Sequence, residues 1–193
     1  METVNLLRNH KRSLLTTQDI SRLTGIEVKR TLENNIRRLI EKNILISLEK
    51  GKYMVAESDV SDFEIANFLY SPSYISFETA LNYHGILSQF PFEITSATSK
   101  KSKKKEILGK TYRYIKINKR LYMGYYKSGN CLIAYPEKAL FDYLYMVALK
   151  KKSEEYLNEM DFSNIKKRGV EEYLPFVSSK SKKEIKLLIS RYL

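Results

Sequence analysis

The chain has 193 residues, enough for one large domain or two small ones, and its 43% hydrophobic content is ordinary for a globular protein. No apolar run approaches the ~20 residues of a membrane-spanning helix, and the first residues lack signal-peptide character, so we expect no membrane partner. The formal net charge of +12 favours a polyanionic partner, although a surface of solvated lysines gives the same excess. The single cysteine, Cys131, excludes an internal disulfide and fits a cytoplasmic protein.

A helix–turn–helix is predicted near the N-terminus. Thr16 or Thr17 can accept a free backbone N–H at the start of a helix, and Gly25 can adopt the positive φ that ends one. A second helix is expected from about residue 28 to 42, because apolar residues recur there with the spacing of one helix face. This predicted apolar stripe consists of Val28, Leu32, Ile36, Leu39 and Ile40.

A basic hairpin is predicted directly after these helices. Residues 44–48 are rich in β-forming side chains, Gly51 lies in the turn, and residues 53–55 return as the second strand. Two helices followed by a basic hairpin predict a winged helix–turn–helix, with one helix in the DNA major groove and the hairpin on the neighbouring backbone. We therefore expect residues 1–57 to form a DNA-binding domain.

The polar side of the second helix and the hairpin supply the candidate DNA contacts. The N-terminal residues of a recognition helix lie against base edges, so the candidates for base contacts are Lys29, Arg30 and Asn34. The candidates for phosphate contacts are Arg37, Arg38, Lys50 and Lys52. For each single residue the alternative is a solvated side chain, whereas the group as a whole favours DNA contact.

Residues 58–193 are expected to form a second, α/β domain with a helical C-terminal part, which makes the chain α+β. Helices are predicted near residues 63–69, from Pro136 onwards, and after Ser76, whose hydroxyl can cap a helix. The sequence alternates or is rich in β-formers at 94–98, 111–117, 121–126 and 131–134, where we expect strands.

A run of lysines lies between two of these predicted strands. We expect it to form a charged loop or the end of a hairpin. It could bind nucleic acid or an acidic partner, and the alternative is a solvated, mobile loop. The run consists of Lys100, Lys101, Lys103, Lys104 and Lys105.

The sequence offers little enzymatic chemistry. His10 and His84 are the only histidines, so with one cysteine they cannot build a zinc site of ordinary spacing, and no glycine-rich phosphate loop is present. Glu137 and Asp142 lie about one helical turn apart but have no base, nucleophile or metal partner in the sequence. We expect a protein that is not an enzyme and uses no metal or cofactor.

Three segments together resemble the AbiEi-type antitoxins and transcriptional regulators of abortive-infection systems. The first is the predicted winged unit, Thr17 to Val55. The second is Tyr74 to Gly85 followed by Ile94 to Thr98, and the third is Ile133 to Tyr145. Tyr135 departs from the family pattern, which has a small or acidic residue there, and residues after about 150 have no counterpart in the resemblance.

The resemblance implies a winged-helix DNA-binding domain joined to an α/β antitoxin domain. Members of the family repress their own operon by binding inverted repeats in its promoter, and they counteract a toxin resembling a nucleotidyltransferase. Two copies, as a dimer or coupled through DNA bending, are then expected on two half-sites of double-stranded DNA. The alternatives are a protein–protein module that docks an acidic toxin, a plain transcription factor with a sensing domain, and an RNA-binding protein.

Overall fold

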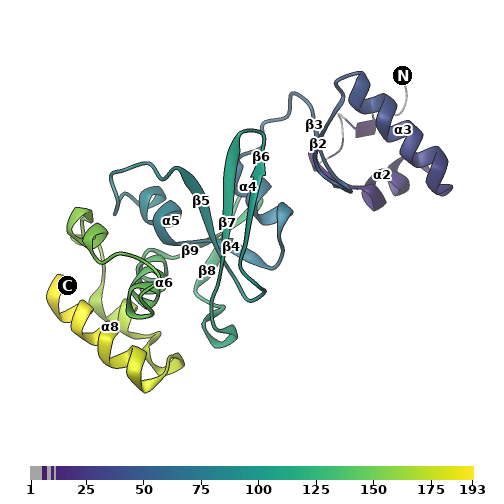
Figure 1. Ribbon diagram of the computed structural model, residues 1–193. Coiled ribbons are helices and arrows are strands. Elements are labelled where there is room, and N and C mark those ends of the chain that lie inside the picture. Colours follow the sequence, from purple (N-terminus) through teal and green to yellow (C-terminus); the bar gives the residue numbers. More distant parts are fainter. Residues whose placement is uncertain (1–5, 8–9, 11) are drawn as a thin grey trace. The chain divides into compact units, whose positions relative to one another are not determined.

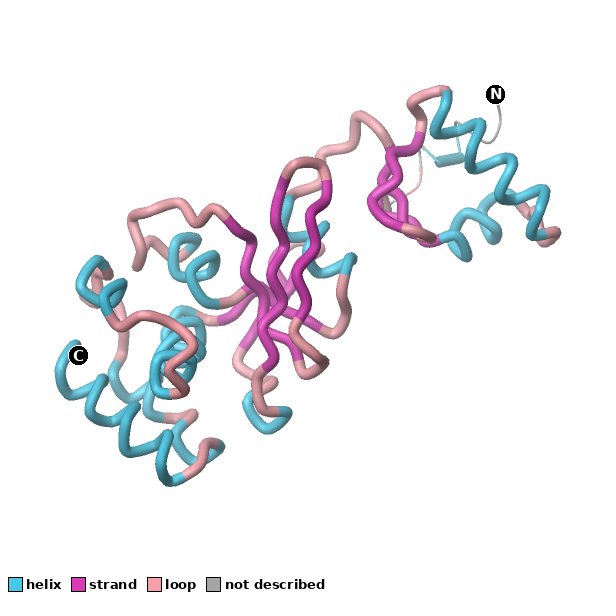
Figure 2. Tube along the Cα trace, in the orientation of Figure 1, coloured by secondary structure: helices cyan, strands magenta, loops and turns pink. Residues whose placement is uncertain are grey.

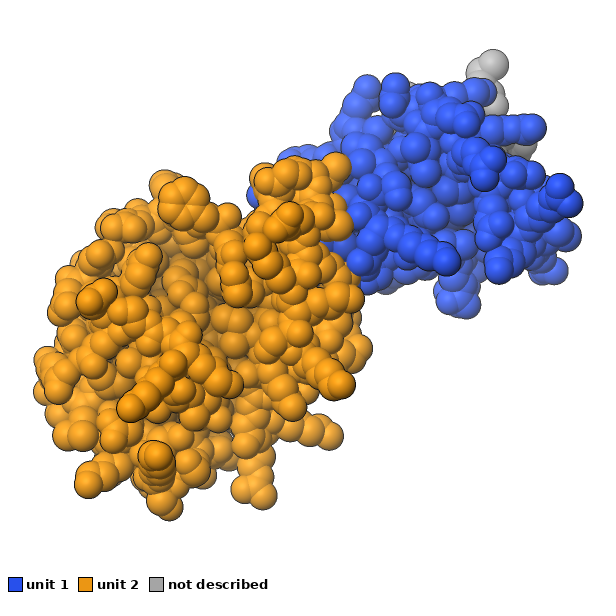
Figure 3. All heavy atoms as spheres, in the orientation of Figure 1, with its two compact units in different colours: residues 1–69 blue, residues 70–193 orange. Residues whose placement is uncertain are grey.

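The structure, a computed structural model, describes residues 6, 7, 10 and 12–193. The fold is mixed α and β, and the chain divides into two compact units, Met1–Leu69 and Tyr70–Leu193 (Figure 3), called unit 1 and unit 2 below. Figure 2 shows one sheet in each unit. The sequence placed the boundary after residue 57, whereas the structure groups the following helix, α4 (Asp62–Leu69), with unit 1.

In its described part, unit 1 combines α4 and two preceding helices with a small antiparallel sheet (Figure 1). The strand order is β1-β3-β2, so β3 lies between the other two. The hairpin is found where the sequence predicted it, whereas β1 was not predicted because three residues are too short to show alternation. The elements are β1 (Leu14–Thr16), α2 (Thr17–Thr24), α3 (Lys29–Glu41), β2 (Leu45–Glu49) and β3 (Lys52–Val55).

A capping box defines the start of α2 and a glycine defines its end, at the positions expected from the sequence. Thr16 is the N-cap residue, and its hydroxyl oxygen accepts a hydrogen bond from Asp19 N at 3.2 Å. The Asp19 carboxylate in turn accepts from Thr16 N at 2.9 Å, which completes a capping box. Gly25 follows the helix with a φ of 68°, the left-handed conformation that a glycine adopts without strain.

The core of unit 1 contains most of the predicted apolar stripe. Leu32, Ile36 and Leu39 of α3 are buried, and Ile40 packs against the edge of the core. Val28 contradicts the prediction, because 66% of its surface is exposed. It is the N-cap residue of α3 and has an extended backbone, so it lies outside the helical repeat that aligns the other four.

Unit 2 is built on a six-stranded mixed sheet with the order β6-β7-β5-β4-β9-β8. The pairs β5–β7 and β4–β9 are parallel, and the other neighbouring pairs are antiparallel. The strands are β4 (Ser73–Ile75), β5 (Glu93–Thr98), β6 (Lys103–Ile107), β7 (Lys110–Lys116), β8 (Tyr125–Ser128) and β9 (Cys131–Ala134).

Helices cover this sheet, and α6 is central among them. It contacts β9, α5, α7 and α8, and Figure 1 shows it between the sheet and α8. Pro136 occupies its first turn, where the missing N–H has no cost, and residues 138–144 are all buried. The α-helices are α5 (Phe77–Tyr83), α6 (Pro136–Ala148), α7 (Lys167–Glu171) and α8 (Ser179–Tyr192). The 3-10 turn η1 (Lys119–Leu121) lies between β7 and β8, whereas η2 (Glu155–Glu159) and η3 (Leu174–Phe176) lie between the helices α6, α7 and α8.

Three local expectations in unit 2 are wrong. Residues 121–126 do not form one strand, since η1 occupies the beginning of this segment and β8 starts only at Tyr125. The lysine run is not simply a loop, because Lys103 to Lys105 begin strand β6. Ser76 precedes α5 but makes no side-chain capping bond, because its hydroxyl donates to Asp142 at 2.8 Å.

Candidate nucleic-acid interface

Three of the predicted DNA contacts share the exposed face of α3. Arg30, Asn34 and Arg37 are exposed and follow one another at intervals of four and three residues. At about 100° per residue, this spacing places them opposite the buried stripe of Leu32, Ile36 and Leu39. Since the stripe anchors the helix in the core of unit 1, the face with Arg30 is turned to solvent.

Arg38 and Lys29 border this face on its two sides. Both are exposed, but the helical repeat places Lys29 nearer to Glu33 and Ile40 than to Asn34. All five predicted residues of α3 therefore lie at the surface. Arg30, Asn34 and Arg37 form a central row, and Lys29 and Arg38 lie outside it. We call these five residues the α3 face.

The charge of α3 is strongest at its N-terminal end. The first turn contains Lys29 and Arg30 and no acidic residue, and the N-cap residue Val28 has no polar side chain. The partial positive charge of the helix dipole and the unpaired N–H groups therefore add to these two cations. Glu33 and Glu41 lie further along the helix and offset part of the positive charge there.

The hairpin between β2 and β3 exposes Lys50, whereas Lys52 makes contacts within unit 1. Lys50 is exposed in the turn, which Thr17 N holds to the start of α2 by donating to Gly51 O at 3.0 Å. The ammonium of Lys52 lies 3.0 Å from a carboxylate oxygen of Glu49 and donates to Leu69 O at 2.6 Å. Lys52 is thus engaged within unit 1 and would have to leave both partners to bind a phosphate, so Lys50 is the better candidate of the two.

The lysine run divides between the two faces of the unit 2 sheet. Because side chains alternate along a strand, Lys103 and Lys105 share one face, and both ammonium groups lie within 5.8 Å of the Tyr70 ring centre. Lys104 occupies the other face, where its ammonium is 3.9 Å from Glu93 and 3.1 Å from Glu106. The run is therefore not one patch.

The two remaining lysines of the run lie before β6. Lys100 joins the group at Tyr70, with its ammonium 5.7 Å from the ring centre, and it also donates to Ser71 O. Lys101 is exposed, and its carbonyl oxygen accepts a hydrogen bond from the Tyr70 hydroxyl at 3.0 Å.

A buried polar cluster in unit 2 was not predicted. Lys138 and Asp142 of α6 form an ion pair with no exposed surface, and Asp142 also accepts hydrogen bonds from the hydroxyls of Tyr74 and Ser76 at 2.8 Å. Asp142 thus has a charged partner, Lys138, whereas the sequence pattern had drawn attention only to Glu137. The i, i+4 spacing of a lysine and an aspartate in an otherwise apolar helix was the available signal.

Burial shifts the pKa values of Tyr74 and Lys138. It raises the pKa of Tyr74 well above the usual value of 10, and the negative charge of Asp142 adds to the shift. Burial also lowers the pKa of Lys138, while the charge and hydrogen bond of Asp142 act in the opposite direction. The cluster joins β4 to α6 and has no exposed surface on Lys138 or Asp142 for a ligand to contact.

The histidines and acids do not gather into a metal site. In the described part of the chain, no three His, Cys, Asp or Glu side chains lie together as metal ligands would. His84 has its Nε2 atom 2.8 Å from Ala134 O, which is a structural contact. Within the same residues, no helix combines the length and apolar character needed to cross a bilayer.

No family model and no curated protein sequence matches this chain. Its fold resembles the crystal structure of the RV2827C protein from Mycobacterium tuberculosis, with a TM-score of 0.64. The match covers 98% of this chain and 75% of the mycobacterial protein at 15% sequence identity. At this identity the likeness concerns the fold alone, and it extends over both units.

Proposed function

We propose that the protein is a DNA-binding transcriptional autorepressor and antitoxin of an abortive-infection toxin–antitoxin system. Unit 1 then acts as a winged helix–turn–helix, with α3 in the major groove and the β2–β3 hairpin as the wing. The observation that carries this proposal is the exposed alignment of Arg30, Asn34 and Arg37 opposite the buried stripe of α3. A helix anchored on one side and cationic on the other is the form in which a recognition helix presents its side chains.

The chemistry of the α3 face fits both kinds of contact that DNA binding needs. Arginine pairs with the two acceptors of guanine and asparagine with the acceptor and donor of adenine, so Arg30 and Asn34 are the proposed base contacts. Lys29, which precedes Arg30 in the first turn, is the third. Arg37, Arg38 and Lys50 are the proposed phosphate contacts, which hold the helix in register. Two copies bound to the inverted repeats of the gene's own promoter then read two half-sites about one helical turn apart.

The antitoxin part of the proposal concerns unit 2. It rests on the resemblance of residues 74–85, 94–98 and 133–145 to the AbiEi-type family. In the structure the first segment forms β4 and α5, the second forms β5, and the third forms β9 and α6. The three strands are neighbours in the sheet, and α5 and α6 pack against each other and against these strands. The proposed opponent is a nucleotidyltransferase-like toxin encoded beside this gene.

A gel-shift series on the gene's own promoter tests the DNA-binding part. We expect binding that prefers the promoter over a scrambled duplex of equal length and that weakens steeply as salt rises from 50 to 200 mM. The salt dependence arises because each neutralised phosphate releases a counterion. Salt-sensitive binding without a preference for the promoter contradicts the proposed repressor, because it shows only non-specific electrostatic binding of a basic protein to DNA.

A co-expression assay tests the antitoxin part. Cells that produce the neighbouring toxin should regain growth when they also produce this protein, and Arg30→Glu should retain that rescue because α3 belongs to unit 1. Failure of the unaltered protein to rescue growth contradicts the antitoxin assignment.

A further inference from the structure

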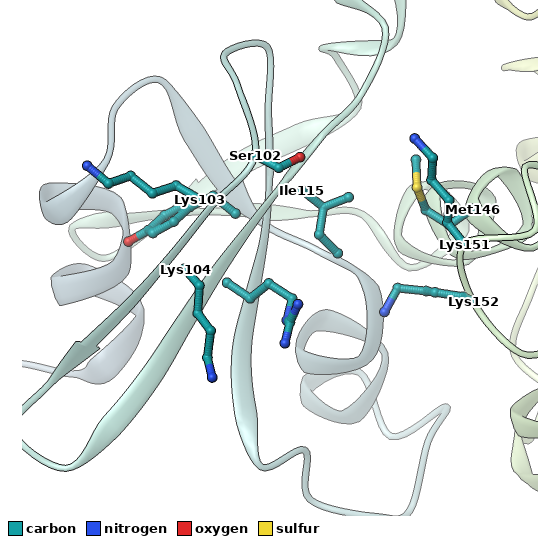
Figure 4. A pocket seen from close by; sticks show the side chains of 9 residues that line it. Ser102, Lys103, Lys104, Ile115, Met146, Lys151 and Lys152 are labelled. Carbon is teal, nitrogen blue, oxygen red and sulfur yellow. The ribbon is translucent and has the colours of Figure 1, made fainter.

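Unit 2 contains two adjoining hollows that the proposed repressor function does not use. The first, of about 480 Å³, lies between the β6–β7 hairpin and the segment after α6 (Figure 4), and we call it the cationic hollow. The second, of about 340 Å³, lies beside the loop between α5 and β5, and we call it the aromatic hollow. Arg113 and Lys152 line both hollows, so the two lie side by side.

The cationic hollow has the chemistry of a phosphate site. Its lining includes five basic residues and no acidic one. Three of them are also paired with carboxylates outside this lining: Lys104 with Glu93 and Glu106, Arg113 with Glu93, and Lys152 with Glu78. In Figure 4, Lys104 and Lys152 enter the space from β6 and from the segment after α6, whereas Lys103 points away from it. Cations on two facing walls attract one anion more strongly than the same charges spread over a convex surface.

Arg113 is held in a fixed position at the junction of the two hollows. Its Nε and Nη2 atoms donate to the two carboxylate oxygens of Glu93, the latter at 2.8 Å. These bonds use two of the five N–H groups of a guanidinium, and within the described residues the other three have no protein acceptor. A planar donor group oriented in this way is suited to bind a phosphate.

The aromatic hollow exposes two large flat rings to solvent. Phe90 is 86% exposed and Phe92 is 103% exposed, although phenylalanine is usually buried. Both line this hollow together with the half-exposed Tyr156. Exposed apolar side chains that gather at one place mark a binding surface rather than a random feature of the protein exterior.

A buried acceptor without a partner lies in the same wall. Glu78 directs one carboxylate oxygen to Lys152, while its other oxygen, Oε2, is buried and makes no hydrogen bond in the described structure. Glu78 also lines the aromatic hollow. An unpaired buried acceptor is costly unless a ligand donor satisfies it, and base amino groups and ribose hydroxyls are such donors.

We propose that these hollows bind a nucleotide of single-stranded nucleic acid, with its phosphate at Lys104, Arg113 and Lys152 and its base on Phe92, the more exposed of the two rings. The combination of adjacent cations and exposed rings distinguishes this ligand from double-stranded DNA, because neighbouring base pairs cover both faces of every base in a duplex. It also distinguishes it from an acidic peptide, which has no need for flat stacking surfaces. The site is independent of the α3 face.

Fluorescence anisotropy with a fluorescein-labelled oligouridylate of 12 nucleotides tests this site on the full chain. Phe92→Ala should weaken binding about tenfold through lost stacking, and Phe92→Trp should restore it. Arg113→Gln should weaken binding by a similar factor, as should Lys104→Gln, which changes a half-exposed side chain on an edge strand. Lys127→Gln, an exposed lysine of β8, is the matched control.

Competition experiments separate the alternative ligands. Unlabelled uridine monophosphate that competes and loses this ability in Phe92→Ala supports the same site with a free nucleotide. Polyglutamate that competes as well as an oligouridylate of equal charge overturns the proposal in favour of an acidic protein partner. Equal affinity of the unaltered protein and both Phe92→Ala and Lys104→Gln also overturns it.

The two proposals fail separately in this design. Arg30→Glu should weaken promoter binding at least tenfold and leave oligouridylate binding unchanged. Phe92→Ala should weaken oligouridylate binding about tenfold and leave promoter binding unchanged. Loss of oligouridylate binding in Arg30→Glu contradicts the assignment to unit 2, whatever the outcome of the promoter experiment.

Discussion

Lys138 and Asp142 are opposite charges in the interior of unit 2, and their surroundings decide how much the pair contributes to the free energy of unfolding. Removing a charge from water costs several kcal/mol, which the partner charge and further hydrogen bonds offset only when the geometry is good. Here Tyr74 and Ser76 supply those further bonds to Asp142. The cluster therefore fixes β4 against α6 rather than adding much net stability.

We expect substitutions that leave one charge of this pair unpaired to be strongly destabilising. Asp142→Asn should lower the free energy of unfolding by about 3–5 kcal/mol, and Tyr74→Phe by about 1.5–3 kcal/mol, because a hydrogen bond to a buried charge is lost. Urea unfolding followed by circular dichroism measures both. The triple variant Lys138→Met, Asp142→Leu, Tyr74→Phe is the control, because it removes both charges together with the Tyr74 hydroxyl and should restore part of the loss.

The pair of Glu93 and Arg113 makes stability depend on pH in the acid range. The hydrogen bond from Arg113 holds the pKa of Glu93 below its usual value of 4.5. A carboxyl with a lowered pKa in the folded state stabilises the protein above pH 4.5, and this contribution is lost as the pH falls through the folded-state pKa. Between pH 6 and 3, the urea midpoint should therefore fall less in Glu93→Gln than in the unaltered protein. Parallel curves contradict this role of Glu93.

At the scale of elements, helices and hairpins with local signals were predicted well. Thr16, Asp19 and Gly25 define the ends of α2 through contacts within a few residues, and Pro136 marks the start of α6 in the same way. Strand β6 was misinterpreted because a run of lysines lacks β propensity, and its pairing with β7 decides its structure. It lies at the edge of the sheet, where lysines also discourage pairing with another chain.

The capping box of α2 gives a prediction at this scale. Thr16→Ala should destabilise unit 1 by about 1 kcal/mol, because the N–H of Asp19 loses its acceptor at the start of the helix. Thermal unfolding measures this as a lower midpoint. Thr31→Ala, at an exposed position of α3, is the control and should change stability by less than about 0.5 kcal/mol. An equal loss in both variants contradicts the capping role of Thr16.

At the scale of the whole molecule, the α3 face was predictable and the contacts between distant segments were not. Arg30, Asn34 and Arg37 follow from the helical repeat alone. The carbonyl that engages Lys52 belongs to Leu69, 17 residues later, and the contact of Tyr74 with Asp142 spans 68 residues, so neither leaves a local pattern. The hollows of unit 2 likewise combine β6, β7 and the segment after α6, which only the fold brings together.

The proposed function depends above all on the α3 face, so its most direct test is a promoter-binding titration with a charge reversal there. Arg30→Glu should weaken binding to the promoter duplex at least tenfold at constant salt, because it replaces an attraction to DNA by a repulsion. Lys186→Glu, an exposed position of α8 in unit 2, makes the same change of net charge and should bind almost as the unaltered protein does. Equal losses in the two variants show that only total charge matters and contradict a recognition role for α3.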